Sequence, residues 1–467
     1  MDHQTPTSIQ AVKLPLKVKL TYGAGSFAKT LLVYLTMVFM LYFYTDVIGI
    51  SSGVAATIIL IAKIWDIIND PMMGAIVDRT RSKEGKCRVW LKYFSVPAGV
   101  IVALCFMMPE LTMTGKIIWV AVTYTLQGMA STALLIPLNT LMGRLSSDKQ
   151  QRAHLNQIAG FYGTAAGWIV PAATLPMVSV FGGEDMQKGF LYVGILYGIL
   201  YALCHLVVFW GTRGYEPLEY LTEAGGEGSV EKAPGLGEVL KALLKNKVWL
   251  FCIGLYFFDV VGSSIESSAQ TYYFQYNLGN VNLLATYSTV ATVTGVLVYA
   301  VLSWFTKHFG NAGTASLGCL MSMVGYGIRF LLHDMNVWVM IVGWTFSTVG
   351  VGLVGATIVL NIFDAKVYGE WKTGVNNEAI LMSGFSVSYK VGMALGGPIA
   401  GYLLMLVPYV PKAAEQAESV KQLFFVENTL LPCVGFLIAL VFSLMIRKYE
   451  KMLPQMRAEI EARKKEA

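Results

Sequence analysis

Residues 22–46 read YGAGSFAKTLLVYLTMVFMLYFYTD, a mostly apolar run whose charged residues are Lys29 and Asp46. A helix needs about 20 apolar residues to cross the hydrocarbon core of a membrane. Because backbone polar groups in lipid must be satisfied within their own segment, such a run is expected to be helical. Residues 22–46 therefore predict a first membrane-spanning helix.

Eleven similar runs follow, so the sequence predicts an all-α polytopic membrane protein with twelve transmembrane helices. The further runs lie at residues 52–77, 90–109, 116–143, 155–180, 188–212, 248–276, 283–306, 312–332, 336–363, 376–407 and 422–446. Several of the twelve are longer than a straight crossing requires, which predicts tilted or broken helices. None shows the alternation of a membrane β-barrel strand.

The composition agrees with this class. Of the 467 residues, 55% are hydrophobic and 14% are charged, and the mean hydropathy is +0.56. A soluble domain carries about 25% charged residues, so an ordinary cytosolic enzyme, a nucleic-acid binder, a secreted disulfide scaffold and a disordered protein are excluded. The six cysteines lack metal-ligand spacing and are expected to be free thiols.

Basic residues indicate the orientation. Most of the 35 Lys and Arg lie before the first run, after the even-numbered runs or after the last one. By the positive-inside rule, both termini are expected in the cytoplasm of a multi-pass protein of the bacterial inner membrane. The charged end RKYEKMLPQMRAEIEARKKEA is expected to be a solvated helical tail.

The longest polar segment divides the predicted spans six and six. It runs from residue 214 to 247 and contains TEAGGEGSVEKAPGLGE, which is typical of a linker. The predicted domains are an N-terminal half at 1–212, a cytoplasmic linker at 213–247, a C-terminal half at 248–447 and a cytoplasmic tail at 448–467. This layout is that of the major facilitator superfamily, in which the solute binds at mid-membrane between the halves.

The densest group of ionisable residues in a span is KIWDIINDP, from Lys63 to Pro71. Asp66 and Asp70 are four residues apart and share one helix face, with Asn69 beside them. Two carboxylates at this spacing repel each other unless a cation or a proton lies between them, and oxygen ligands suit a hard cation such as Na⁺. The alternative is that Lys63 neutralises Asp66 in a salt bridge without functional meaning.

A short basic segment follows, with the pattern GxxxDR at Gly74 to Arg79. It is expected to be a turn that sets the topology, in which Asp78 pairs with Arg79 or Arg81 and contributes to gating. The longer string IWDIINDPMMGAIVDRTRSKEGKCRVW closely resembles the glycoside–pentoside–hexuronide:cation symporters, the melibiose-carrier family. The strings KLTYGAGSFAKT, YFYTDVIGIS and FDAKVYGEWKTGVNNEA extend the resemblance over residues 17 to 450.

The resemblance implies a twelve-helix fold and sugar uptake coupled to Na⁺, H⁺ or Li⁺. It implies a cation site at Asp66, Asn69, Asp70 and Thr132, and a lysine near both sites at Lys390. The alternative for Lys390 is a lysine that reaches the membrane interface.

The family's sugar site is only partly matched. The resemblance implies substrate-binding positions at Lys29, Thr30, Leu135 and Asn139, but Thr30 and Leu135 stand where the family has aspartates. A leucine offers only apolar contact, whereas a carboxylate binds sugar hydroxyls through charge-assisted hydrogen bonds. The cavity is therefore expected to prefer a less polar ligand, such as a glycoside with an apolar aglycone, while a hexuronide could meet Lys29 or Lys390.

Two acidic pairs lie in the second half. Asp259 and Glu266, seven residues apart, are expected either to line the solute cavity or to form hydrogen bonds between helices. Asp364 and Glu370 are expected to form gate-closing salt bridges with Lys366, Lys372 or the turn after the second span.

These expectations combine into secondary active transport: symport of a glycoside or related sugar by alternating access, with Na⁺, H⁺ or Li⁺ as coupling ion and no organic cofactor. The alternative is a carrier of the same family for an amphipathic non-sugar solute, lysolipid- or steroid-like, which Leu135 motivates. An enzyme is not expected, because no catalytic dyad is found. The expected partners are a small-molecule substrate and the lipid bilayer, without nucleic acid, and the protein is expected to be monomeric.

Overall fold

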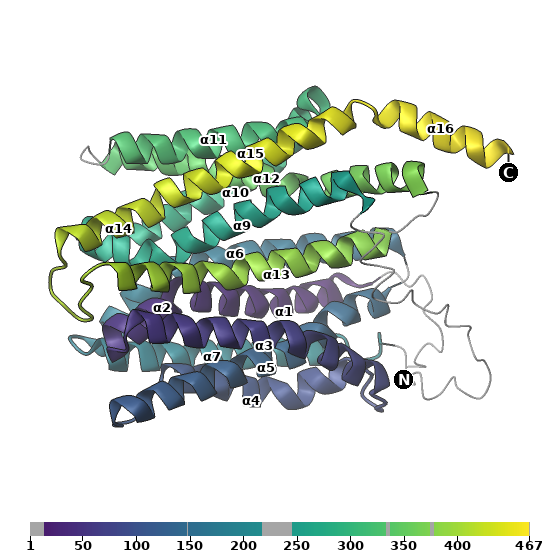
Figure 1. The fold of residues 1–467 in the computed structure, drawn as a ribbon. Coiled ribbons are helices and arrows are strands. Elements are labelled where there is room, and N and C mark those ends of the chain that lie inside the picture. Colours follow the sequence, from purple (N-terminus) through teal and green to yellow (C-terminus); the bar gives the residue numbers. More distant parts are fainter. Residues whose placement is uncertain (1–13, 147, 217–244, 333–336, 374–377, 467) are drawn as a thin grey trace. The chain divides into compact units, whose positions relative to one another are not determined.

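The computed structural model describes residues 14–146, 148–216, 245–332, 337–373 and 378–466. Its regular elements are helices, and no strand occurs among the described residues (Figure 1). Twelve helices in this part of the chain are long and apolar enough to cross a membrane. The predicted fold class and the number of spans are confirmed.

The first half contains six of these spans. Their elements are α1 (Leu16–Tyr34), η1 (Leu35–Phe39), α2 (Met40–Tyr42), η2 (Phe43–Ile48), α3 (Ser52–Arg79), α4 (Arg88–Phe106), α5 (Met113–Leu145), α6 (Lys149–Gly182) and α7 (Met186–Gly211). The first span is one run of helix, Leu16–Ile48, that changes to π-helical winding at η1 and η2. This irregular winding agrees with the expectation that long apolar runs are tilted or broken.

The second half contains the other six spans. Their elements are α9 (Lys247–Tyr272), η4 (Tyr273–Asn277), α10 (Leu283–Phe309), α11 (Asn311–Leu331), α12 (Val337–Thr373), α13 (Glu378–Leu403), η5 (Leu404–Leu406), α14 (Glu418–Asn428) and α15 (Leu430–Glu450), followed by α16 (Leu453–Glu466). The last span, Glu418–Glu450, is interrupted at Thr429 between α14 and α15.

The chain forms two compact units. One comprises residues 1–229 with 410–414, and the other comprises residues 230–409 with 415–467. The division falls inside the predicted linker, most of which lies outside the described residues. Within the segment at 410–414, the Lys412 side chain lies 3.3 Å from the position that a Cβ atom on Gly49 would occupy.

Small residues let helices approach closely in the first unit. A Cβ atom built on Gly99 of α4 would collide with the carbonyl oxygen of Gly198 on α7, and the reverse collision occurs at Gly198. Close approach at small residues is the usual packing of membrane helices, where lipid supplies no hydrophobic drive for association. This contact fixes the third span of the first half against the sixth.

A buried carboxylate caps the third span of the first half. Glu216, which follows α7, accepts the backbone N–H groups of Cys87 at 2.8 Å and Arg88 at 3.1 Å, where α4 begins. Arg144 donates to the same carboxylate at 3.1 Å. Gly85 has a φ of 100°, and a Cβ atom there would collide with Glu216. A carboxylate at a helix N-terminus satisfies free N–H groups and opposes the helix dipole.

The second half repeats this device. Glu450 at the end of α15 accepts the backbone N–H groups of Asn311 and Ala312, where α11 begins. Gly310 has a φ of 77°, and a Cβ atom there would collide with Glu450. In each half, therefore, a glutamate near the end of the sixth span holds the N-terminus of the third span.

The C-terminal segment corrects one expectation. The expected solvated helical tail is present as a helix with mostly exposed residues, but α16 also packs on the end of α12. Met456 is 1% exposed, the Trp371 indole N–H donates to Glu459 at 2.6 Å, and Arg463 donates to the Trp371 carbonyl at 2.8 Å. The charge pattern alone does not reveal this docking, because the contacts join Trp371 to residues about 90 positions later in the chain.

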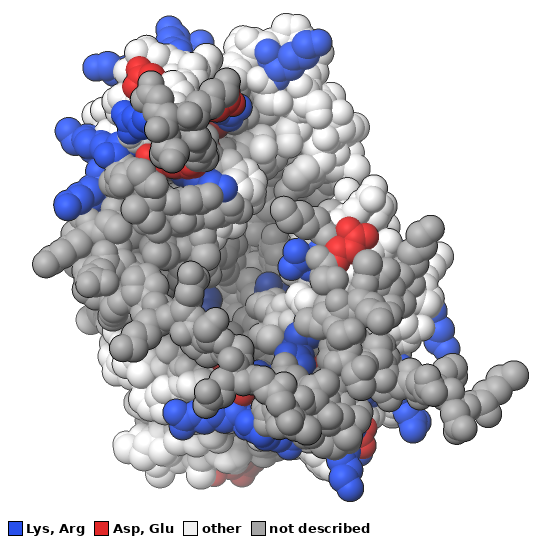
Figure 2. All heavy atoms as spheres, turned by 90° about the vertical axis from the view of Figure 1, so that its right-hand side faces the viewer, with Lys and Arg blue, Asp and Glu red and all other residues white. Residues whose placement is uncertain are grey.

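Basic side chains gather at the helix ends where α3 finishes and α4 begins. Figure 2 views the molecule from this side and shows Lys and Arg spread over it, with fewer Asp and Glu. Arg79, Arg81 and Lys83 are exposed there. This distribution is the feature on which the predicted orientation depends.

Candidate functional site

The two acidic residues of α3 face α5. Thr132 Oγ1 of α5 donates a hydrogen bond of 3.0 Å to Asp70 Oδ1. One turn earlier on α5, a Cβ atom added to Gly128 would collide with the Asp66 carboxylate. Since Gly128 and Thr132 are four residues apart, as Asp66 and Asp70 are, the two carboxylates lie against one face of α5.

Lys63 continues this arrangement by one more turn. Its ammonium lies 3.4 Å from Asp66 Oδ2 and 5.7 Å from the centre of the Tyr124 ring on α5. The ion pair that the sequence offered as an alternative is therefore present. It engages Asp66, whereas the hydroxyl of Thr132 engages Asp70.

This cluster consists of oxygen ligands suited to a small hard cation. The carboxylates of Asp66 and Asp70 and the hydroxyl of Thr132 come together between α3 and α5, and the Asp66 side chain keeps 24% of its exposure. Asn69 is half-buried next to Asp70, and its role as a cation ligand stays a prediction. Because the donors are carboxylate and hydroxyl oxygens, they suit Na⁺, Li⁺ or a proton better than a soft transition metal.

The predicted solute positions of the first half are less closely grouped. Lys29 of α1 and Asn139 of α5 are exposed, and Thr30 and Leu135 are half-buried. The Thr30 hydroxyl lies against α6, 3.1 Å from the position of a Cβ atom on Gly163. These four residues stay predictions as substrate ligands.

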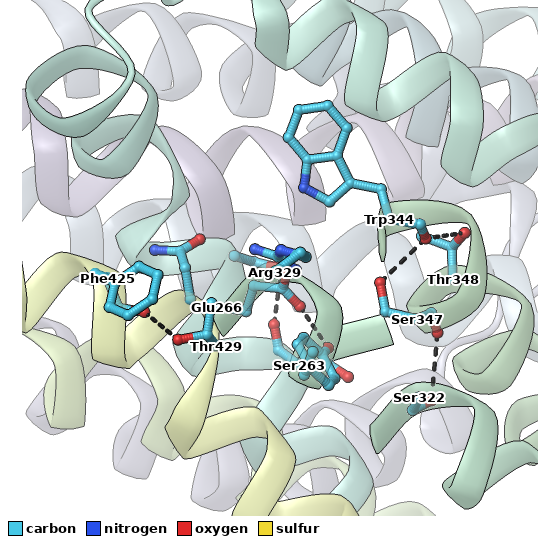
Figure 3. A network of polar contacts seen from close by, with 12 residues as sticks. Ser263, Glu266, Ser322, Arg329, Trp344, Ser347, Thr348, Phe425 and Thr429 are labelled. Atoms are coloured by element: carbon cyan, nitrogen blue, oxygen red, sulfur yellow. Dashed lines mark hydrogen bonds and ion pairs between the residues drawn. The ribbon is translucent and has the colours of Figure 1, made fainter. Parts of the chain in front are cut away.

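In the second half, Glu266 of α9 forms hydrogen bonds to another helix, which is one of the two alternatives that the sequence offered for it. Arg329 of α11 donates to Glu266 Oε1 at 2.7 Å, and the Tyr326 hydroxyl donates to Oε2 at 2.6 Å. Arg329 is 1% exposed. Figure 3 shows this pair inside a network of polar contacts, with the hydrogen bond from Ser347 to the Trp344 carbonyl nearby. Both oxygens of Glu266 are thus engaged within the half.

Asp259 and Lys390 have different environments. Asp259 is buried on α9, and its Oδ1 has no hydrogen-bond partner among the described residues. Lys390 is half-buried on α13. Asp259 is therefore the acidic residue of α9 that still has an oxygen available for a ligand, while the role of Lys390 stays a prediction.

The expected gating pairs have different partners. Asp78 pairs with Lys86 at 3.4 Å instead of with Arg79 or Arg81, because the turn after α3 brings Lys86 back to it. Asp364 accepts a hydrogen bond of 2.7 Å from the Asn311 side chain of α11, a neutral partner in place of the expected Lys366 or Lys372. Glu370 is half-buried near the end of α12, and its gating role stays a prediction.

Several polar residues escaped the sequence analysis. Glu216, Arg329 and Glu427 are charged residues in or beside apolar runs, which is the signal that should have drawn attention to them. Cys87 lies beside Glu216. Its burial, and secondly the negative charge of the Glu216 carboxylate, raise the pKa of the Cys87 thiol, so this cysteine is an inert buried group.

The chain resembles known transporters over nearly its whole length. The model of the MFS/sugar transport protein family matches residues 21–449. The isoprimeverose transporter of Lactiplantibacillus pentosus is 29% identical over 98% of this chain and 94% of its own length. The putative glycoside/cation symporter YagG of Escherichia coli strain K12 is 26% identical over 95% of both chains.

A solved structure supports the fold. The bacterial homologue of the human lysosomal transporter Spinster superposes with a TM-score of 0.65 at 13% identity, over 94% of this chain and 97% of its own. At this identity the likeness concerns the fold alone. From the family match over residues 21–449, together with the twelve spans, this chain belongs to the MFS/sugar transport protein family.

Proposed function

We propose that this protein takes up a glycoside or related sugar together with a cation, and that Asp66, Asp70 and Thr132 hold the cation. The family establishes that the protein is a transporter and not an enzyme. The observation that carries the cation site is the alignment of both carboxylates on the face of α5 at Gly128 and Thr132. Two adjacent carboxylates in a membrane helix favour a positive partner between them, and Lys63 already shows that a positive charge is held beside Asp66.

The coupling follows from linkage. A cation that binds Asp66 and Asp70 competes with the Lys63 ammonium for Asp66, so cation binding releases Lys63 and changes the contact between α3 and α5. If the form stabilised by the cation also binds the solute more tightly, the solute must raise the affinity for the cation by the same factor. Alternating access then follows from movement of the two six-helix halves.

The solute class rests on the relatives. Names such as isoprimeverose transporter, glycoside/cation symporter and glucuronide carrier homolog favour a sugar or glycoside over a lysolipid- or steroid-like solute. Lys29, Thr30, Leu135, Asn139, Asp259 and Lys390 are the proposed substrate positions. The exposed Arg79, Arg81 and Lys83 after α3 support the proposal that this end of the first half faces the cytoplasm, and both termini are proposed to lie there as well.

Uptake into proteoliposomes tests this function. Isoprimeverose, a phenyl glucuronide and a lysolipid are compared as solutes under gradients of Na⁺, Li⁺ or protons. We expect uptake of a glycoside to depend on one of these cations in the wild type, and Asp70→Asn to abolish that dependence. Glu110→Gln, an exposed carboxylate outside the spans, is the matched control and should behave as wild type. Uptake of the lysolipid alone, or glycoside uptake indifferent to all three cations, would refute the proposal.

A further inference from the structure

The last membrane span is interrupted where it is deeply buried. α14 ends at Asn428 and α15 begins at Leu430, and the intervening Thr429 has a φ of −132° and a ψ of −66°, outside the helical region. Pro432 in the first turn of α15 has no backbone N–H to offer. Irregular backbone at membrane depth is tolerated only where it is buried in protein or lines a polar site.

Unpartnered acceptor oxygens lie directly before this break. Glu427 is 0% exposed, and neither Oε1 nor Oε2 has a hydrogen-bond partner among the described residues. Asn428 is also 0% exposed, and its amide donates to the Phe424 carbonyl at 2.9 Å while its Oδ1 has no partner in the same part of the chain. A carboxylate in this position has lost its hydration without gaining a donor.

Two charged groups on the neighbouring helices are engaged with each other, namely Glu266 of α9 and Arg329 of α11, joined at 2.7 Å. The other charged residues of α9 are Lys247, at its first position, and the acidic Asp259. Figure 3 shows that pair together with the hydrogen bond of 2.6 Å from Thr429 to the Phe425 carbonyl, and the Phe425 ring lies 5.4 Å from that of Phe330 on α11. Arg329 therefore neutralises Glu266 and does not bond to Glu427.

The remaining titratable groups on the described elements around α14 make no hydrogen bond to Glu427. Phe424, about one turn before Glu427 on α14, stacks on Tyr272 of α9 at 5.1 Å and on Tyr276 of η4 at 5.9 Å, with Tyr409 at its edge. The titratable residues of α15 are Cys433 and then, four turns further on, Arg447 to Glu450. Lys421 lies nearly two turns before Glu427 on α14 itself. Within the described ranges, therefore, no hydrogen bond or ion pair joins a basic side chain to this carboxylate.

The carboxylate must therefore be neutralised by a guest of single positive charge. A sodium ion needs several oxygens that converge on one point, but the side chains of Glu427 and Asn428 are adjacent on a helix and leave it about 100° apart. A proton needs only one carboxylate oxygen. We propose that Glu427 is a proton-binding site in the second half, occupied at neutral pH and separate from the carboxylates of α3.

Infrared spectroscopy of the full-length purified protein tests this site. A protonated carboxyl gives a carbonyl stretching band that is absent from a carboxylate and shifts in deuterated water. We expect the wild type to show this band at pH 7 with and without Na⁺, and Glu427→Gln to lack it. Glu110→Gln, at an exposed position, should retain it. Loss of the band on adding Na⁺, or an identical band in wild type and Glu427→Gln, would overturn the proposal.

A second measurement needs no variant. Dicyclohexylcarbodiimide reacts with protonated carboxyls in apolar surroundings, and mass spectrometry of the wild type locates the adduct. We expect modification of Glu427 at neutral pH that declines as the pH is raised. A wild type that is unmodified at Glu427 under conditions that label other membrane carboxyls would refute the proton site. Neither the infrared nor the labelling experiment measures transport. The proton site can therefore be refuted while the proposed symport is supported, and the symport can be refuted while the proton site is supported.

Discussion

Replacing Gly128 by alanine tests the geometry of the proposed cation site while leaving all three of its proposed ligand residues unchanged in the sequence. The added methyl group would occupy space now held by the Asp66 carboxylate, whose Cγ lies 3.1 Å from the new Cβ position. Asp66 can rotate about its side-chain bonds, so the helices need not separate. The carboxylate is instead expected to turn away from α5 and from its neighbour Asp70.

The magnitude follows from the loss of one charged ligand. An interaction with a charged group contributes about 1.5–3 kcal/mol, which corresponds to about a 10- to 100-fold weaker cation affinity. The helix itself should not suffer, because alanine is favoured over glycine in a helix interior by about 1 kcal/mol. Gly128→Ala should therefore fold normally and bind the cation poorly.

Calorimetric titration of the purified protein with Na⁺ and Li⁺, repeated at several pH values, measures this effect. Gly143→Ala is the matched control, because it lies on the same helix and its Cβ position has no atom within 4 Å. The control should keep the wild-type affinity. If Gly128→Ala and Gly143→Ala bind the coupling cation equally well, Asp66 is not a ligand at the face of α5 and the reasoning is refuted.

Three further perturbations test other contacts. Glu266→Gln leaves the buried Arg329 without its counter-charge, which costs about 3–5 kcal/mol and should lower the thermal unfolding midpoint. Gly198→Ala drives a methyl group into a backbone carbonyl of α4 and should also lower that midpoint. The hydrogen bond from Trp371 holds the pKa of Glu459 below its ordinary value, so this contact should stabilise the docking of α16 at neutral pH. The contact should weaken as the pH falls through the acidic range, which tryptophan fluorescence can follow.

Each of these has a control and a contrary result. Glu110→Gln should leave the unfolding midpoint unchanged, and an equal midpoint for Glu266→Gln would mean that the buried pair contributes nothing to stability. Gly160→Ala, with open space around its Cβ position, should not destabilise the first half. In Trp371→Phe the acid-induced change should disappear; if it persists, another tryptophan reports it and the tail is not its source.

The extent of sequence-based prediction differs between the fold and the site. Twelve spans followed from the length and polarity of the runs, because the membrane allows few alternatives to a helix. The spacing of Asp66 and Asp70 likewise predicted that they share a face. The identity of that face, Gly128 and Thr132, depends on how α3 packs on α5, and no local pattern encodes this packing.

Partner choice was the main failure, since it depends on contacts between distant segments. Glu266 was correctly noticed as an acid in a span, but its partner Arg329 is 63 positions away. Asp78 was expected to pair with the arginines nearest in sequence, whereas the turn after α3 places Lys86 beside it as its ion-pair partner. The α16 segment was interpreted from its charge alone, yet its apolar residue Met456 is buried against the rest of the protein.

The glutamates that cap α4 and α11 also bear on how the protein is made. The ribosome releases the start of α4 long before Glu216, and the start of α11 long before Glu450. Until those residues are synthesised, the N–H groups that open each third helix have no protein acceptor and depend on water. Each half is thus completed only when its sixth helix has left the ribosome, and a chain stopped just short of either glutamate would present the quality-control machinery with a helix end that has not been closed.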